Sequence, residues 1–167
     1  LDPHQADLIG VSLCSKIGKA CYIPIGHKSS KCIKKDIVIK KLKPLLEDPS
    51  VKKIGQNIKF DFIILYNQGI TISSMEDTML MSYVLDAGKN RHNMDTLSEI
   101  HLGHKTITFK EIVGTGKKEI NFSEVKADKA KDYAAEDADI TFRLYKKFIK
   151  NLKLEKMINI YEIFEKP

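Results

Sequence analysis

Residues 127–150 hold the sequence feature that most limits the possible folds: an amphipathic helix with an acid on its apolar side. At about 100° per residue, one stripe of this helix collects Tyr133, Asp137, Ile140, Leu144 and Phe148. The opposite arc, expected to face solvent, collects Glu136, Asp139, Arg143, Lys146 and Lys150. A buried carboxylate is costly unless something satisfies it. Asp137 therefore predicts a metal, a strong hydrogen-bond network or a functional charge.

The length of 167 residues predicts one domain, residues 1–167, and the composition is that of an ordinary soluble globule. No apolar run approaches the roughly 18–20 residues of a membrane span, so no membrane partner is expected. The net charge of +6 comes mostly from lysines, with Arg91 and Arg143 as the two arginines. A lysine-rich surface suits loose attraction to phosphates. A solvated surface of biased composition explains the charge equally well.

The order of the predicted elements favours an α/β or α+β fold that opens with an antiparallel hairpin. Strands are expected at 7–14, 19–25 and 53–55. Helices are expected at 36–46, 58–68, from Asp77 to 85, from Asp95 to 102, at 127–150 and at 154–164, with a loop at 105–122. Asp77 and Asp95 are interpreted as helix caps and not as catalytic groups.

Asp61 is a second acid in apolar surroundings, because it lies in the helix predicted at 58–68. It could cap that helix, but Asn57 is better placed to do so. We therefore favour Asp61 as an acid that faces the same cleft as Asp137. Tyr133 lies one turn before Asp137, so their side chains are neighbours. Its phenol is either a core aromatic with a wet hydroxyl or a group that orients a nucleophilic water.

Phe109 stands in a polar loop and is either a plug on the core or a stacking platform for a base. The residues alone leave both open. His101 and His104 share a helix face, but no third ligand accompanies them, so a metal site there is not expected. The glycines at 114 and 116 do not fit the phosphate-loop pattern.

Two segments resemble the second and third motifs of the DEDD 3′–5′ exonucleases, Tyr subtype: residues 55–61 (GQNIKFD) and 133–139 (YAAEDAD). Other segments narrow the resemblance to the proofreading domain of bacterial family A DNA polymerases. They are residues 45–48 (LLED), 77–79 (DTM), 91–95 (RHNMD) and 104–109 (HKTITF). The order and spacing of these motifs together are highly specific. The resemblance implies a ribonuclease H-like α/β fold, in which helices flank a mixed sheet.

The resemblance also implies a reaction: two Mg²⁺ or Mn²⁺ ions assist hydrolysis of the last phosphodiester at a DNA 3′ end. Asp137 would bind the first ion, Asp61 would support the second, and Tyr133 would orient the attacking water. The frayed single strand would be held by Leu1, Gln56, Asn57, Phe60, Arg91, Met94 and Phe109. Phe60 departs from the tyrosine common at its position, so a hydroxyl contact is lost while ring stacking remains.

One motif of the family is not in the sequence, because no Asp-x-Glu occurs anywhere in it. In the family, these two acids bridge both metals from the central strand of the sheet. We therefore expect the sequence to begin inside a larger polymerase, with this strand before Leu1. The resemblance further implies a polymerase domain in cis, a role in replication and repair, a monomer, and the nucleoid of the bacterial cytoplasm.

Two alternatives remain beside this expectation. The first is a DNA-binding module of the same fold that has lost catalysis, against which Asp61, Tyr133 and Asp137 argue because an idle buried carboxylate destabilises a fold. The second is a ribonuclease D-like RNA exonuclease of the same superfamily. The segment 105–122 disfavours it, because those enzymes lack a comparable segment.

Overall fold

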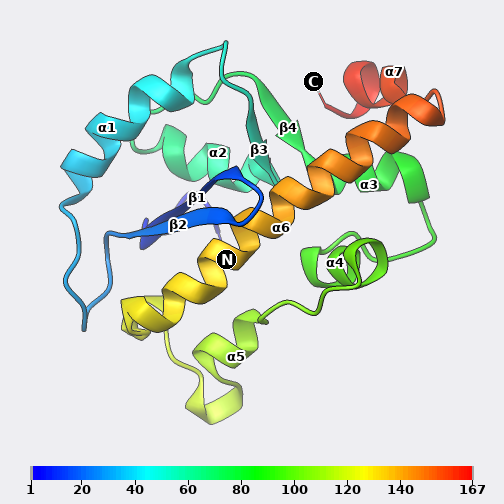
Figure 1. Ribbon diagram of the computed structural model, residues 1–167. Coiled ribbons are helices and arrows are strands. Elements are labelled where there is room, and N and C mark those ends of the chain that lie inside the picture. Colours follow the sequence, from blue (N-terminus) through cyan, green and yellow to red (C-terminus); the bar gives the residue numbers. More distant parts are fainter. Residues whose placement is uncertain (1, 167) are drawn as a thin grey trace.

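One long helix, α6 (Ala127–Leu154), runs through the middle of the molecule in the computed structural model, which describes residues 2–166 (Figure 1). Packed on it are β1 (Gly10–Lys16), β2 (Lys19–Pro24), β3 (Lys53–Gly55), α3 (Thr78–Asp86), α4 (Met94–Leu102) and α5 (Phe109–Val113). The predicted apolar stripe is confirmed, because Ile140, Leu144 and Phe148 are all buried. Because α6 contacts each of these elements, it fixes their positions relative to one another.

The strands form two separate pairs of opposite type. β1 and β2 make the predicted antiparallel hairpin, and β3 pairs in parallel with β4 (Met75–Asp77). Within residues 2–166 no strand hydrogen-bonds to both pairs. Both strand directions therefore occur, but the described strands form two separate pairs and not the single mixed sheet that the resemblance implies. The sequence patterns did not reveal β4, which has only three residues.

The remaining helices flank these pairs. They are α1 (Lys35–Glu47), α2 (Ile58–Tyr66), and α7 (Ile158–Ile160), which continues into a π-helical turn at Tyr161–Glu165. One apolar core joins α6 to α3, α4 and the C-terminal turn, and another joins the hairpin to α1 and α2. None of the described helices is both long and apolar enough to cross a membrane.

Asp77 caps a helix as predicted, but it caps two helices at once. Its carboxylate accepts hydrogen bonds from Met79 N at 2.8 Å in α3, and from Asn57 N at 3.0 Å and Ile58 N at 2.9 Å at the start of α2. The prediction that Asn57 caps α2 is therefore wrong. Asn57 is left-handed (φ 58°), and its side chain makes no capping bond. Its exposed amide remains available for other partners.

Two other sequence predictions need correction. The cap of α4 is Asn93, which accepts from Thr96 N, whereas Asp95 accepts from Thr106 Oγ1 at 2.6 Å. The predicted loop at 105–122 contains α5, which begins with a capping box formed by Thr108 and Glu111. This Thr-x-x-Glu spacing is a helix-start signature visible in the sequence.

We expect Asp77→Ala to cost about 2–4 kcal/mol in the free energy of unfolding, because each lost helix cap costs roughly 0.5–2 kcal/mol and the remaining donors stay buried. Urea unfolding monitored by circular dichroism measures this change. Asp36→Ala is the matched control, since Asp36 is an exposed acid in the first turn of α1. Equal losses in the two variants would contradict the shared-cap interpretation.

Candidate active site

Asp137 is the acid of α6 that its surroundings leave unsatisfied. Its side chain is half-buried, and its Oδ1 atom is buried with no hydrogen-bond partner among the described residues. Burial raises the pKa of Asp137 to about 7, the Tyr133 phenol opposes this shift, and the charges of Asp95 and Glu136 add to it. A carboxylate in this condition is suited to bind a cation or to hold a proton.

The neighbouring acids of α6 are satisfied, and the prediction that they face solvent is wrong. Glu136 accepts a hydrogen bond from Ile107 N at 2.6 Å and so holds the segment before α5. Asp139 accepts from Gly18 N at 2.6 Å and so holds the turn of the hairpin. Both are therefore structural anchors. Asp137, which has no such task, remains the candidate for chemistry.

Tyr133 lies beside Asp137, as the helical spacing predicts. Its phenol is half-buried, and burial together with the charge of Asp137 raises the pKa of Tyr133 far above its usual value. The hydroxyl therefore keeps its proton at neutral pH. A protonated phenol next to a carboxylate can donate a hydrogen bond to it, or to a water molecule between the two groups.

Asp61, in the first turn of α2, combines exposure with crowding. Its side chain is open to solvent, yet the surrounding protein raises the pKa of Asp61 to about 6, with a further contribution from the charge of Asp77. Both α2 and α6 contact β3, but no hydrogen bond or ion pair in residues 2–166 joins Asp61 to Asp137. Their sharing of one cleft stays a prediction.

The residues predicted to hold the single DNA strand fall into an exposed group and a packed group in the structure. Leu1 lies outside the described residues. Asn57, Arg91 and Phe109 are exposed. Phe60 and Met94 are half-buried, and Met94 packs against the core that contains α6.

Gln56 differs from the other candidates, because its amide is already engaged. It donates to His92 O at 2.8 Å and accepts from Thr78 Oγ1. These bonds hold the segment that carries Arg91 and Met94 next to the end of β3. Gln56 therefore serves at least to bring together the elements that carry the other candidates.

Three rings, Phe109, Phe122 and Tyr133, form what we call the aromatic wall. Phe109 stacks on Phe122 with 5.8 Å between ring centroids. Tyr133 lies against both, at 6.1 Å from Phe109 and 6.3 Å from Phe122. The sequence analysis missed Phe122. The Asn-x-x-Glu spacing at 121–124, which caps its short helix, was the available signal.

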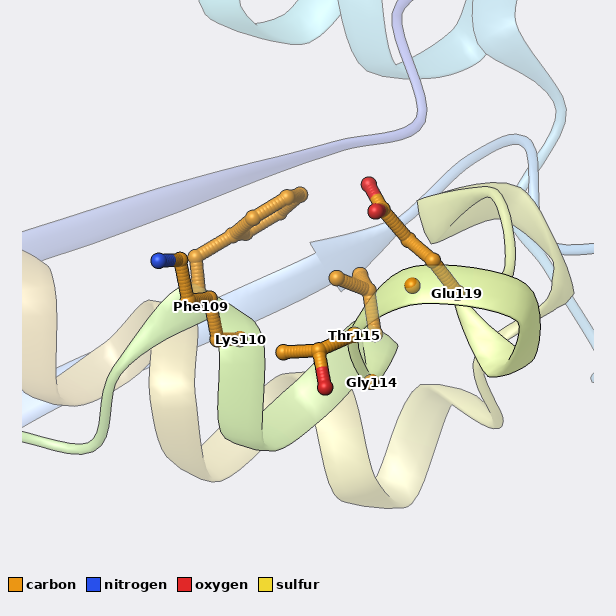
Figure 2. Close-up of a pocket in the computed structure, with 7 residues that line it drawn as sticks. Phe109, Lys110, Gly114, Thr115 and Glu119 are labelled. Atoms are coloured by element: carbon orange, nitrogen blue, oxygen red, sulfur yellow. The ribbon is translucent and has the colours of Figure 1, made fainter.

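Phe109 packs on the protein and also keeps an exposed face, so its use as a stacking platform for a base stays a prediction. It packs on Phe122, yet 41% of its surface stays exposed. It also lines a pocket of about 340 Å³ with Lys110, Thr115 and Glu119. Figure 2 shows the ring and the Glu119 carboxylate directed toward the same open space. The exposed part of the ring is accessible to a flat partner.

The described acids match part of a divalent-cation site. The unpartnered oxygen of Asp137 is a ligand of the kind that Mg²⁺ or Mn²⁺ prefers. Residues 2–166, however, contain no group of three or more His, Cys, Asp or Glu side chains that could hold a metal ion. Asp137 and Asp61 therefore need further ligands, such as water or a substrate phosphate.

Comparison with known proteins places these features in a family. A family model described as 3′–5′ exonuclease, of the DNA polymerase A type, matches residues 1–153. DNA polymerase I of Rhizobium leguminosarum is 41% identical over all of this chain and 18% of its own length. DNA polymerase I of Pseudomonas aeruginosa is 44% identical over 87% of this chain and 16% of its own length. The chain thus spans about a fifth or less of these relatives.

Solved structures share the fold. Brucella melitensis NrnC gives a TM-score of 0.70 at 22% identity, covering 94% of this chain and 70% of its own. The same protein with bound Mg²⁺ gives a TM-score of 0.66 at 21% identity. The match covers 93% of this chain and 69% of the NrnC chain. These similarities confirm the ribonuclease H-like α/β fold expected from the sequence.

Asp137 predicts a pH dependence of stability. Its folded pKa of about 7 lies above its ordinary 3.8, so the folded state holds more protons than the unfolded state between these values. The free energy of unfolding must then fall as pH rises from about 4 to 7. At pH 8 with a chelator, the free energy of unfolding of Asp137→Asn should equal that of the wild type or exceed it by up to roughly 1–3 kcal/mol.

Thermal and urea unfolding from pH 4 to 8 measure this difference. Asp132→Asn is the matched control, because Asp132 is an exposed acid on the same helix. We expect the control to stay within about 0.5 kcal/mol of the wild type at every pH. A large loss of stability in Asp137→Asn at pH 8 would make Asp137 a structural carboxylate.

Proposed function

We propose that this chain, which belongs to the 3′–5′ exonuclease family of family A DNA polymerases, removes mismatched nucleotides from the 3′ end of DNA. One observation carries the proposal. Asp137 keeps a buried, unpartnered carboxylate oxygen beside the protonated phenol of Tyr133, while its neighbours Glu136 and Asp139 are fully used as anchors. Such a carboxylate destabilises the fold, so its presence is best explained by use in the reaction.

We propose distinct roles for the three candidate catalytic residues. Asp137 and Asp61 hold divalent cations, Mg²⁺ or Mn²⁺, together with water and the substrate phosphate. When bound, such cations stabilise the attacking and leaving oxygens of phosphodiester hydrolysis. Tyr133 keeps its proton and orients the attacking water through its hydroxyl. The bound Mg²⁺ of the similarly folded NrnC agrees with this choice of metal.

The proposed substrate is an unpaired 3′ end. The partly exposed ring of Phe109 offers a stacking surface that tolerates any base, and Asn57 and Arg91 offer exposed polar contacts. Such a site selects for a strand that is free to leave its partner, which is the physical basis of proofreading. We further propose that the domain works as a monomer beside a polymerase domain of the same polypeptide, in the bacterial cytoplasm.

The test of function is a labelled oligonucleotide with a matched or a mismatched 3′ end, digested by the protein at its natural length. The mismatched end should be degraded faster, by about tenfold for each 1.4 kcal/mol of pairing energy that need not be spent. Phe109→Ala should weaken binding of all sequences alike. An RNA of the same sequence is the comparison substrate. Preference for the RNA would favour a ribonuclease D-like activity, and cleavage of neither would favour a binding module.

Cation binding provides a separate test. In calorimetry with Mn²⁺, Asp137→Asn and Asp61→Asn should each lower the affinity of the natural-length protein by about tenfold or more. Asp132→Asn, on the exposed side of α6, should leave the affinity unchanged. The 167-residue chain alone should bind weakly, since its described acids form no group of three. Tight binding by this chain would reveal ligands other than those assigned.

A further inference from the structure

His27 is a buried side chain, 5% exposed, with a partner for each ring nitrogen. Nδ1 lies 2.7 Å from Val125 O, and Nε2 lies 2.6 Å from the hydroxyl of Tyr22. A carbonyl oxygen only accepts, so Nδ1 carries the proton. In the neutral ring Nε2 then accepts, and the hydroxyl of Tyr22 donates to it. The pair is therefore fully satisfied in one arrangement, which fixes the orientation of the imidazole.

The imidazole of His27 packs against the aromatic wall. The centroid of its ring is 5.6 Å from the centroid of Phe122, one of the three rings of the wall. The loop that follows His27 is tied to the same segment, because Lys28 N donates to Ser123 O at 2.8 Å and Ala127 N donates to Ser30 Oγ at 2.8 Å. The short helix that carries Phe122 is thus held by the loop after β2.

Tyr22 in turn is held by the hairpin. Its phenol lies over Gly10 in the opposite strand, where an added Cβ would come within 2.1 Å of the hydroxyl oxygen. Burial raises the pKa of Tyr22 to about 12, so the phenol keeps the proton that it donates to His27. Gly10, Tyr22 and His27 therefore form a continuous support from β1 to Phe122.

We propose that His27, oriented by Tyr22, is a positioning residue for the unpaired DNA 3′ end. It acts through Phe122, which sets the angle at which Phe109 and Tyr133 meet the strand. The inference rests on the proposed exonuclease function, in which Phe109 stacks on a base. It adds the requirement that neither His27 nor Tyr22 touches the DNA. Both residues influence DNA binding only through the aromatic wall.

A double-mutant cycle on the natural-length protein tests this mechanism. The dissociation constant for a single-stranded 12-mer is measured by fluorescence anisotropy for the wild type, His27→Ala, Phe109→Ala and the double variant. Phe109→Ala should weaken binding about fivefold or more, the equivalent of one lost stacking contact. His27→Ala should weaken it by at least about threefold. The double variant should bind no more weakly than Phe109→Ala, because coupled residues are not additive.

A spectroscopic signal separates positioning from general destabilisation. With 2-aminopurine as the 3′-terminal base, stacking on the wall quenches fluorescence, and His27→Ala should relieve part of this quenching at saturating protein. Tyr22→Phe should also relieve part of the quenching, while it preserves the ring over Gly10. If His27→Ala fails to fold, the test uses Tyr22→Phe in its place. Tyr66→Phe is the control, because it removes an exposed phenol hydroxyl on α2.

The outcomes distinguish the two proposals. Additive losses in the double variant, or unchanged quenching in both Tyr22→Phe and His27→Ala, overturn the positioning role while the exonuclease function stands. If the wild type neither binds the 12-mer nor shortens it, the proposed function fails and the inference fails with it. Non-additive losses with relieved quenching, and a control that matches the wild type, support the role of His27.

Discussion

The carboxylate of Asp77 is the interaction on which the arrangement of the site depends. β3 and β4 run in parallel and in register, with Gly55 opposite Asp77, so the two strands end side by side. A single carboxylate at this point reaches the free N–H groups at the starts of α2 and α3. Anions are favoured at helix N-termini, and here one anion serves two helices. The position of Asp61, one turn into α2, follows from this bond.

The segment from Gly55 to Asp61 illustrates how one motif combines structural and functional demands. A Cβ on Gly55 would come within 2.7 Å of Ile58 Cβ, so glycine permits the tight connection from β3 to α2. Asn57 tolerates the left-handed conformation that the connection requires. Ile58 is buried, whereas Asp61 is exposed. The structural residues of the motif thus fix the backbone, and its acid remains free for chemistry.

Periodicity predicted the long elements correctly and failed where partners are distant in sequence. The stripe of α6, the hairpin and the Asp77 cap were all visible, because each depends on neighbours within a few residues. Glu136 and Asp139 were wrongly assigned to solvent, because their partners, Ile107 and Gly18, lie far away in the chain. A helical wheel shows which residues share a side of a helix, but not which segment covers that side.

In the candidate site, too, features that depend on nearby residues were predicted, and features that depend on distant residues were not. Local environment singled out Asp61, Tyr133 and Asp137, and the resemblance suggested their roles. In the structure the pKa values of all three are raised, Tyr133 and Asp137 are half-buried, and Asp61 is exposed. Phe122 and His27 were not predicted, because each matters through contacts with segments elsewhere in the chain. Residues that support a site are, for this reason, harder to find in one sequence than residues that act in it.

Asp77 also connects the site to the C-terminal turn that follows α7. Its backbone N–H donates to the hydroxyl of Tyr161 at 2.9 Å, and that hydroxyl donates to Glu76 at 2.9 Å. Burial alone would raise the pKa of Glu76, but Lys52 and Tyr161 outweigh it and lower the value. The buried charge is therefore compensated from two directions. Because Tyr161 is itself fully buried, the C-terminal turn is part of the support for β4, and the helix caps at the site depend on both ends of this network.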